Sequence, residues 1–191
     1  WCGAVPGVDE FAPLFFNISP REAQEMDPRQ RLLLQESWNA LEDAGYGEER
    51  LAQERVGVYV GVEQGDYQIL LAEAGVGNVT ANHDAVLASR LSYLLDLDGP
   101  VLAINTACSS SLVAAHQACL ALRSGECDTA VVGGVNLLLR PYIFIGLAQS
   151  GMLSDDGKCH AFDRRANGMV PGEAIAVVVL KRLVDARVQG D

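Results

Sequence analysis

The stretch Val101-Leu102-Ala103-Ile104-Asn105-Thr106-Ala107-Cys108-Ser109-Ser110-Ser111 takes a short apolar strand through a turn and into a helix. The helix is predicted over residues 109–123, stops at Gly125, and consists mostly of small and apolar residues, which implies burial nearly all round. Cys108 therefore stands on or just before the first turn of a buried helix. Free backbone N–H groups and the positive end of the helix dipole stabilise a thiolate at such a position, and the same groups can hold a developing oxyanion.

Cys108 is the candidate nucleophile on these grounds. The alternative interpretation of the same position is a small core hydrophobe, which is the usual role of a free cysteine. Three consecutive serines follow Cys108, and a purely structural turn has little use for so many hydroxyl groups, so the pattern favours a function. Cys119 and Cys127 lie inside the predicted helix and just before the next strand, and both are predicted to be core residues.

Strands and helices alternate outward from this turn. The fold class is therefore α/β, with a mainly parallel sheet covered by helices on both faces. The glycines within the strands predict that other parts of the chain approach closely there. No repeat or long linker divides the chain, which indicates one domain or part of one. The predicted strands are 56–62, 101–104, 129–135 and 174–181, the predicted helices are 28–44, 67–73, 84–95 and 109–123, and 141–151 is a mixed region.

Composition excludes several classes of protein. The chain has 191 residues, of which 49% are hydrophobic, and 14 basic against 25 acidic side chains give a net charge of -11. Such a chain can bury a sizeable core, but its charge repels phosphate backbones, so no nucleic-acid partner is expected. No apolar run reaches the roughly 18 residues of a membrane span. The five cysteines are odd in number and lack a CxxC pair, which suits a reducing compartment and predicts a cytoplasmic protein.

No second type of site is predicted. His116 lies eight residues beyond Cys108 on the same helix, about two turns away, and is too far along the axis to serve as its base. His83 begins a predicted helix, and Cys159-His160 lacks further ligands at metal spacing, so no metal site is expected. The glycines form no GxGxxG between a strand and a helix, and no nucleotide cofactor is expected.

Five ordered motifs extend over the whole chain, within 9–34, 88–93, 106–114, 125–136 and 162–183. Together they resemble one family, the β-ketoacyl synthase (ketosynthase) domains of modular type I polyketide synthases, which have a thiolase-like, layered α-β-α fold. The segment Met169-Val170-Pro171-Gly172-Glu173-Ala174 stands where the family has a more glycine-rich version, and in this it resembles synthases served by separate acyltransferases. Asn105 departs from the aspartate that is frequent at its position.

This resemblance implies a role for Cys108 as the acyl-accepting nucleophile. An acyl chain would move to it from the phosphopantetheine of an acyl carrier protein, and a malonyl-type extender on a second carrier would lose carbon dioxide and attack the Cys108 thioester in a decarboxylative Claisen condensation. The resemblance implies no bound cofactor of the domain's own. Its implied partners are acyl carrier protein domains, neighbouring synthase domains and a second copy in a homodimer.

The resemblance also implies that the chain is incomplete. Residues 1–191 match most of the first half of the domain, without the opening strand and helix, and the family's histidine and lysine motifs belong to a second half. We therefore expect that this chain alone does not complete condensation. The alternatives are a fatty-acid-type ketosynthase, a non-elongating ketosynthase that only passes chains along, and a non-catalytic dimerisation or interaction module.

Overall fold

A four-stranded sheet with the strand order β2-β1-β3-β4 forms the centre of the protein. The computed structural model describes residues 1–191, apart from the side chain of Glu48. Strands β1, β2 and β3 are parallel, and β4 pairs antiparallel with β3. The predicted mainly parallel α/β sheet is confirmed, with strand bounds close to the predicted ones. The strands are β1 (Val56–Val62), β2 (Val101–Ile104), β3 (Thr129–Asn136) and β4 (Ala174–Lys181).

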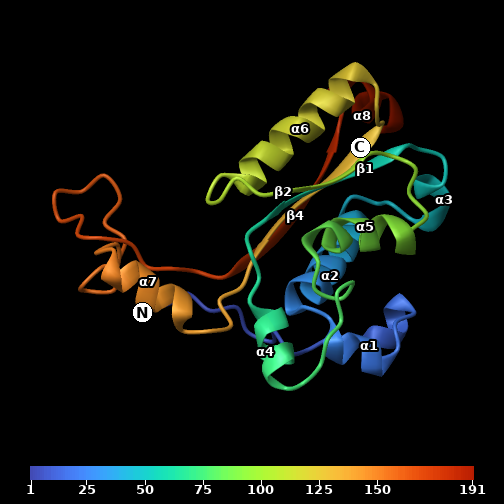
Figure 1. The fold of residues 1–191 in the computed structure, drawn as a ribbon. Helices are drawn as coiled ribbons and strands as arrows, with labels where there is room; N and C mark the ends of the chain where they lie inside the picture. Colours follow the sequence, from blue (N-terminus) through green and yellow to red (C-terminus); the bar gives the residue numbers. More distant parts are fainter.

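Helices cover the two faces of this sheet unequally. Figure 1 shows α6 (Ser110–Ser124) on one side of the sheet and α2 (Pro28–Asp43) and α5 (Asp84–Leu94) on the other. Alternate residues of a strand pack into the hydrophobic cores on the two faces of the sheet, because successive side chains in a strand point to opposite faces. Val58 and Val131 belong to the core under α2 and α5, whereas Tyr59 and Val132 belong to the core under α6. Every residue of β1 is buried, as expected for a central strand.

Capping residues explain where the main helices begin and end. Asp27 accepts a hydrogen bond from the backbone of Arg29 at 2.8 Å, and Pro28 occupies the first turn of α2. His83 caps α5 by accepting from the backbone N–H of Ala85 at 3.1 Å. Gly125 ends α6 in the left-handed conformation that glycine adopts without strain. The sequence patterns therefore predicted these helices to within a residue or two.

The exposure of α6 differs from the prediction of burial all round. One face packs on the sheet through Ala114 and Ala118, but Leu112 is 76% exposed and Leu120 is 43% exposed. Small and apolar composition indicated burial, but it could not show that one face of the helix lies open in the described chain. The predicted mixed region contains α7 (Tyr142–Gln149), an apolar helix with no buried residue among those described.

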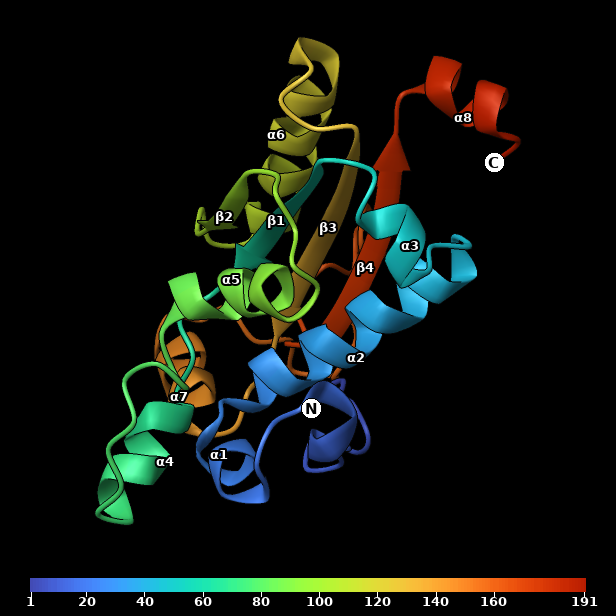
Figure 2. The same ribbon diagram turned by 90° about the vertical axis from the view of Figure 1, so that its right-hand side faces the viewer.

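Several shorter elements lie at the margins of the sheet (Figure 2). Among them, α4 confirms the helix predicted at 67–73, and the others match no predicted range. These elements are η1 (Pro13–Phe16), α1 (Pro20–Glu25), α3 (Glu48–Leu51), α4 (Tyr67–Glu73) and α8 (Leu183–Gln189). No helix in the described chain is both long and apolar enough to cross a bilayer.

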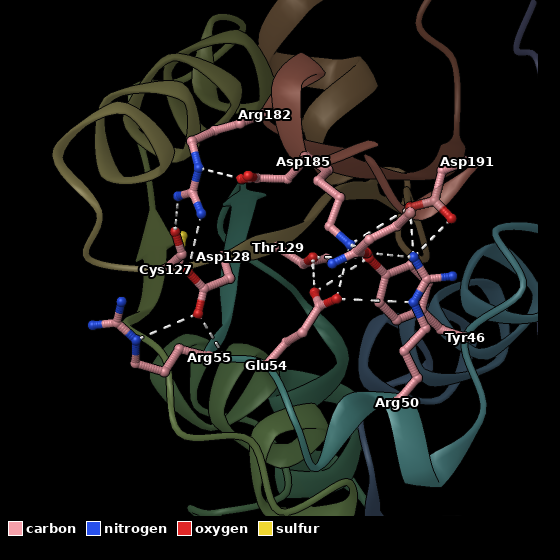
Figure 3. Close-up of polar contacts among 12 residues, drawn as sticks. Tyr46, Arg50, Glu54, Arg55, Cys127, Asp128, Thr129, Arg182, Asp185 and Asp191 are labelled. Carbon is pink, nitrogen blue, oxygen red and sulfur yellow. Dashed lines mark hydrogen bonds and ion pairs between the residues drawn. The ribbon is translucent and has the colours of Figure 1, made fainter. Parts of the chain in front are cut away.

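A network of charged groups lies where β1 and β3 begin and β4 ends (Figure 3). The Glu54 carboxylate accepts from the Lys181 ammonium at 2.8 Å and from the Thr129 hydroxyl, which also contacts the Tyr46 hydroxyl at 2.9 Å. Burial alone would raise the pKa of Glu54, but the bonds from Lys181 and Thr129 hold it below its usual value.

Arg182 forms a second part of this network. Its guanidinium donates to the backbone carbonyls of Leu122 and Cys127 at 2.9 and 2.8 Å and pairs with Asp128 at 3.0 Å. The bond to Leu122 satisfies a carbonyl in the last turn of α6, where a cation also complements the helix dipole. Arg182 therefore fastens the C-terminal end of α6 to the end of β4.

Candidate active site

Cys108 lies in an exposed turn between β2 and α6, two residues before the helix begins. This confirms its predicted place just ahead of a helix N-terminus. The preceding residue, Ala107, has φ +54°, a left-handed conformation that is uncommon for a residue with a side chain. The N-cap residue Ser109 makes no side-chain hydrogen bond to the first turn of α6. Its hydroxyl donates instead to the carbonyl of Thr106 at 2.8 Å.

Two further side chains bond within this turn. Asn105 accepts from the backbone N–H of Ala107 at 3.0 Å. The hydroxyl of Ser110 accepts from the N–H of Thr106 at 2.9 Å and donates to the carbonyl of Ala107 at 2.7 Å. Two of the three serines that favoured a function thus form bonds that shape the turn. Sequence reasoning noted the hydroxyls but missed this use of them.

Two glycines allow the start of α6 to rest directly on the sheet. A Cβ on Gly61 of β1 would lie 2.6 Å from the Cα of Ser111, and a Cβ on Gly134 of β3 would lie 2.9 Å from the Cβ of Ser111. Real Cβ atoms do not approach other atoms so closely, so neither position accepts a larger residue without moving the helix. The predicted close approach to the glycines of these strands is confirmed here. It sets the height of the Cys108 turn above the ends of β1 and β3.

A cavity of about 520 Å³ opens beside Cys108. It lies between the first turns of α6 and the sheet, and it is walled mainly by apolar or small side chains, which suits an uncharged chain better than a polar ligand. Glu63 is the one charged residue among the described residues that line it. The residues from α6 include Leu112 and Ala115, and those from the strands include Gly61, Gly134, Ala176 and Val178.

Arg29 holds the loop that follows β1 at the edge of this cavity. Its buried guanidinium pairs with Asp27 at 2.8 Å and Asp84 at 3.0 Å, and it donates to the backbone carbonyl of Glu63. Burial alone would lower the pKa of Arg29, but these two carboxylates raise it above its usual value. Arg29 contacts Glu63 and Asp84, which lie 34 and 55 residues further along the chain. A local sequence pattern could therefore not predict its role.

None of the three histidines forms a hydrogen bond with the Cys108 thiol in the described chain. His116 is exposed on α6, and its eight-residue offset from Cys108 corresponds to about 12 Å along the helix axis. His83 is the cap of α5, and His160 contacts the Asp156 carboxylate at 2.8 Å. No group of metal-ligating side chains was found among the residues that the structure describes. Cys127 is buried, as predicted for a core residue, whereas Cys119 is partly exposed.

Comparison with known proteins identifies the family. The model of the β-ketoacyl synthase N-terminal domain matches residues 1–186. The chain belongs to the β-ketoacyl synthase family. It is 54% identical over its whole length to polyketide synthase ThaG of Burkholderia thailandensis and 50% identical over 97% of its length to polyketide synthase PksM of Bacillus subtilis. It spans 3% and 4% of these two proteins.

Solved ketosynthase structures share the fold. A cysteine-to-serine variant of the ketosynthase from module 6 of the Bacillus subtilis bacillaene synthase superposes with a TM-score of 0.92 and 46% identity. That match covers 98% of this chain and 32% of the bacillaene chain. The oxazolomycin ketosynthase domain OzmH KS7 of Streptomyces albus superposes with a TM-score of 0.93 and is 44% identical in sequence. That match covers 100% of this chain and 34% of the oxazolomycin chain. The predicted thiolase-like ketosynthase fold of polyketide synthases is confirmed, as a partial domain.

Proposed function

We propose that this ketosynthase domain accepts an acyl chain on Cys108 during polyketide chain elongation. The Cys108 thiolate attacks the carbonyl carbon of an acyl-phosphopantetheine thioester presented by an acyl carrier protein. The new carbon–sulfur bond forms, the bond to the pantetheine sulfur breaks, and the released thiolate takes a proton from solvent. No cofactor of the domain's own enters this step.

The position of the thiol is the observation that carries this proposal. Cys108 is exposed at the start of α6 and at the mouth of a largely apolar cavity. The dipole of α6 favours negative charge there, and backbone N–H groups at a helix start can stabilise the oxyanion of a tetrahedral intermediate. The cavity offers a place for the carbon chain of the acyl group. Family membership supports the same chemistry.

The second step of the proposal is the condensation. A malonyl-type extender on a second carrier loses carbon dioxide, and the resulting carbanion attacks the Cys108 thioester, so that a carbon–carbon bond forms and the cysteine thiolate leaves. Decarboxylation needs groups that stabilise the developing charge. In the described part of the chain no hydrogen bond involves the Cys108 thiol, and His116 is about two helical turns away. We propose that histidine and lysine motifs of the kind found in the ketosynthase family serve this step in the parent synthase.

The further partners in the proposal are neighbouring synthase domains and a second ketosynthase copy, in the cytoplasm. The edge of the sheet supports the dimer: β2 lies at the end of the strand order, and Leu102 on it is 40% exposed. A strand edge of this kind can pair with another chain. Similarity to polyketide synthases favours a polyketide-type over a fatty-acid-type ketosynthase. For the parent enzyme we further propose that separate acyltransferases serve it, with chain passing without elongation as the alternative to condensation.

Acyl transfer to Cys108 is tested by incubating the intact protein that carries this sequence with a short acyl-pantetheine thioester, followed by peptide-mapped mass spectrometry. Three of the five cysteines are exposed, namely Cys2, Cys108 and Cys159, so exposure alone predicts labelling of all three. We expect the acyl mass on Cys108 only.

Two controls sharpen this test. Cys108→Ala should lose the label, whereas Cys159→Ala should retain it at the wild-type rate. Iodoacetamide should alkylate all three exposed cysteines, which shows that they are accessible. Equal acylation of Cys2, Cys108 and Cys159, or none, would contradict the proposed role of Cys108.

A further inference from the structure

The turn that presents Cys108 contains a conformation that needs support. Ala107 has φ +54°, and a residue with a Cβ atom occupies this region at a cost that its surroundings must offset. Ala107 directly precedes Cys108, so a change in the φ of Ala107 moves the Cys108 thiol relative to the start of α6. The question is which group holds Ala107 in place.

The Ser110 hydroxyl has the geometry to do so. It accepts from the N–H of Thr106, the residue before Ala107, at 2.9 Å and donates to the carbonyl of Ala107 itself at 2.7 Å. The backbone N–H of Ser110 also donates to the Ala107 carbonyl, at 3.0 Å. Ser110 therefore closes the turn with both its side chain and its backbone N–H.

Burial separates Ser110 from the other hydroxyls of the turn. Ser110 is only 6% exposed, whereas Thr106 and Ser109 are exposed. Water can replace the bonds that Ser109 and Thr106 form, but it has little access to the position of the Ser110 oxygen. Loss of that oxygen would leave the buried side of the turn without a partner for the Thr106 N–H.

We infer that Ser110 is a positioning residue for the nucleophile: its hydroxyl locks Ala107 in the left-handed conformation and thereby fixes the Cys108 thiol against the first turn of α6. This inference rests on the proposed function, because it assigns Ser110 a part in presenting the acyl acceptor. Ser110 does not exchange protons or bonds with the substrate in this role. It acts through the backbone of Ala107.

The experiment measures the rate of Cys108 acylation in the intact protein at varied concentrations of a short acyl-pantetheine thioester. Ser110→Ala should lower the maximal rate by about tenfold to a hundredfold, the range expected for a nucleophile misplaced by up to an ångström. The concentration for half-maximal rate should change little, because the hydroxyl is engaged by the backbone of Thr106 and Ala107. Ser110→Thr, which keeps a hydroxyl, should recover part of the rate. Ser124→Ala is the matched control, because Ser124 lies at the other end of α6 and bonds to the carbonyl of Ala121.

A second substitution tests the mechanism of the effect. If Ser110 acts by holding Ala107 at positive φ, then Ala107→Gly should restore part of the rate in the Ser110→Ala background, because glycine adopts this conformation without a steric penalty. A serine needed only for folding would not be rescued in this way. Amide exchange adds a readout independent of catalysis: the Thr106 N–H should exchange faster in Ser110→Ala and unchanged in Ser124→Ala.

The outcomes separate this inference from the proposed function. Wild-type acylation of Cys108 together with equally fast acylation of Ser110→Ala would overturn the role of Ser110 and leave the function standing. A raised half-maximal concentration with an unchanged maximal rate would also overturn it, as would failure of Ala107→Gly to rescue. If the wild-type protein takes no acyl group on Cys108, both the function and this inference fail.

Discussion

The two ends of the sheet are built by opposite means. Where β1 and β3 end, glycines and hydroxyls let α6 begin close to the sheet, and the exposed Cys108 turn lies over a mainly apolar cavity. Where these strands begin, Glu54, Lys181 and Arg182 tie the chain together with charged hydrogen bonds (Figure 3). The first end depends on shape and leaves a reactive group open. The second fixes the opposite end of the same helix through the bond from Arg182 to the Leu122 carbonyl.

The largest effect is expected at the glycine contact. Gly61→Ala would force the first turn of α6 off β1, and we expect a loss of about 2–3 kcal/mol in the free energy of unfolding and at least a tenfold loss of Cys108 acylation. Chemical denaturation and the acylation assay measure the two. The matched control is Gly146→Ala in α7, where a Cβ would meet nothing within 4 Å. If Gly61→Ala acylates normally, the glycine does not set the position of the turn.

The buried ion pair comes next in size. The Glu54 and Lys181 side chains are 11% and 8% exposed, and Glu54→Gln should destabilise the protein by about 2 kcal/mol, because it leaves a poorly solvated ammonium whose remaining carboxylate is that of Asp191 at 3.5 Å. The rate of Cys108 acylation in the folded protein should stay unchanged. The double variant with Lys181→Met should recover part of the stability, and a double variant worse than the sum of the single ones would contradict this account of the pair.

A pH dependence follows from the same carboxylate. The pKa of Glu54 is lower in the folded protein than in the unfolded chain, so its contribution is present above the unfolded pKa of about 4.3 and is lost as the pH falls through the lower folded value. Wild type should therefore lose thermal stability on acidification below about pH 4.3 more steeply than Glu54→Gln. If the melting temperatures of the two proteins fall by the same amount between neutral and acidic pH, Glu54 is not a source of the pH dependence.

The smallest effect is expected at Arg182. Arg182→Lys keeps the charge but cannot reach both backbone carbonyls and Asp128 at once, and the side chain is 32% exposed. We expect a loss of about 1 kcal/mol, with normal acylation of Cys108. A stability loss as large as that of Glu54→Gln would show that the anchoring of α6 at its C-terminal end matters more than the buried ion pair.

Local patterns predicted most elements and the candidate nucleophile. Alternation of apolar strands with helical stripes located β1 and β4 at their observed bounds, and the strand-to-helix turn located Cys108. The pattern could not show that β4 runs antiparallel, because apolar spacing is the same in both directions. It could not show the exposure of Leu112, since composition does not reveal which neighbours cover a helix. The role of Ser110 depends on the φ of Ala107, and that of Arg29 on contacts with Glu63 and Asp84, which only the folded chain brings together.

The central position of β1 has a consequence for synthesis of the protein. Both neighbours of β1 come later in the chain, β2 at Val101–Ile104 and β3 at Thr129–Asn136. During translation the apolar segment Val56–Val62 therefore waits with both edges open until its partners have left the ribosome, and chains in such a state are prone to aggregation. The pairings also close long loops, which slows folding. Production of this ketosynthase domain should therefore benefit from slow expression or from chaperones that bind nascent apolar strands.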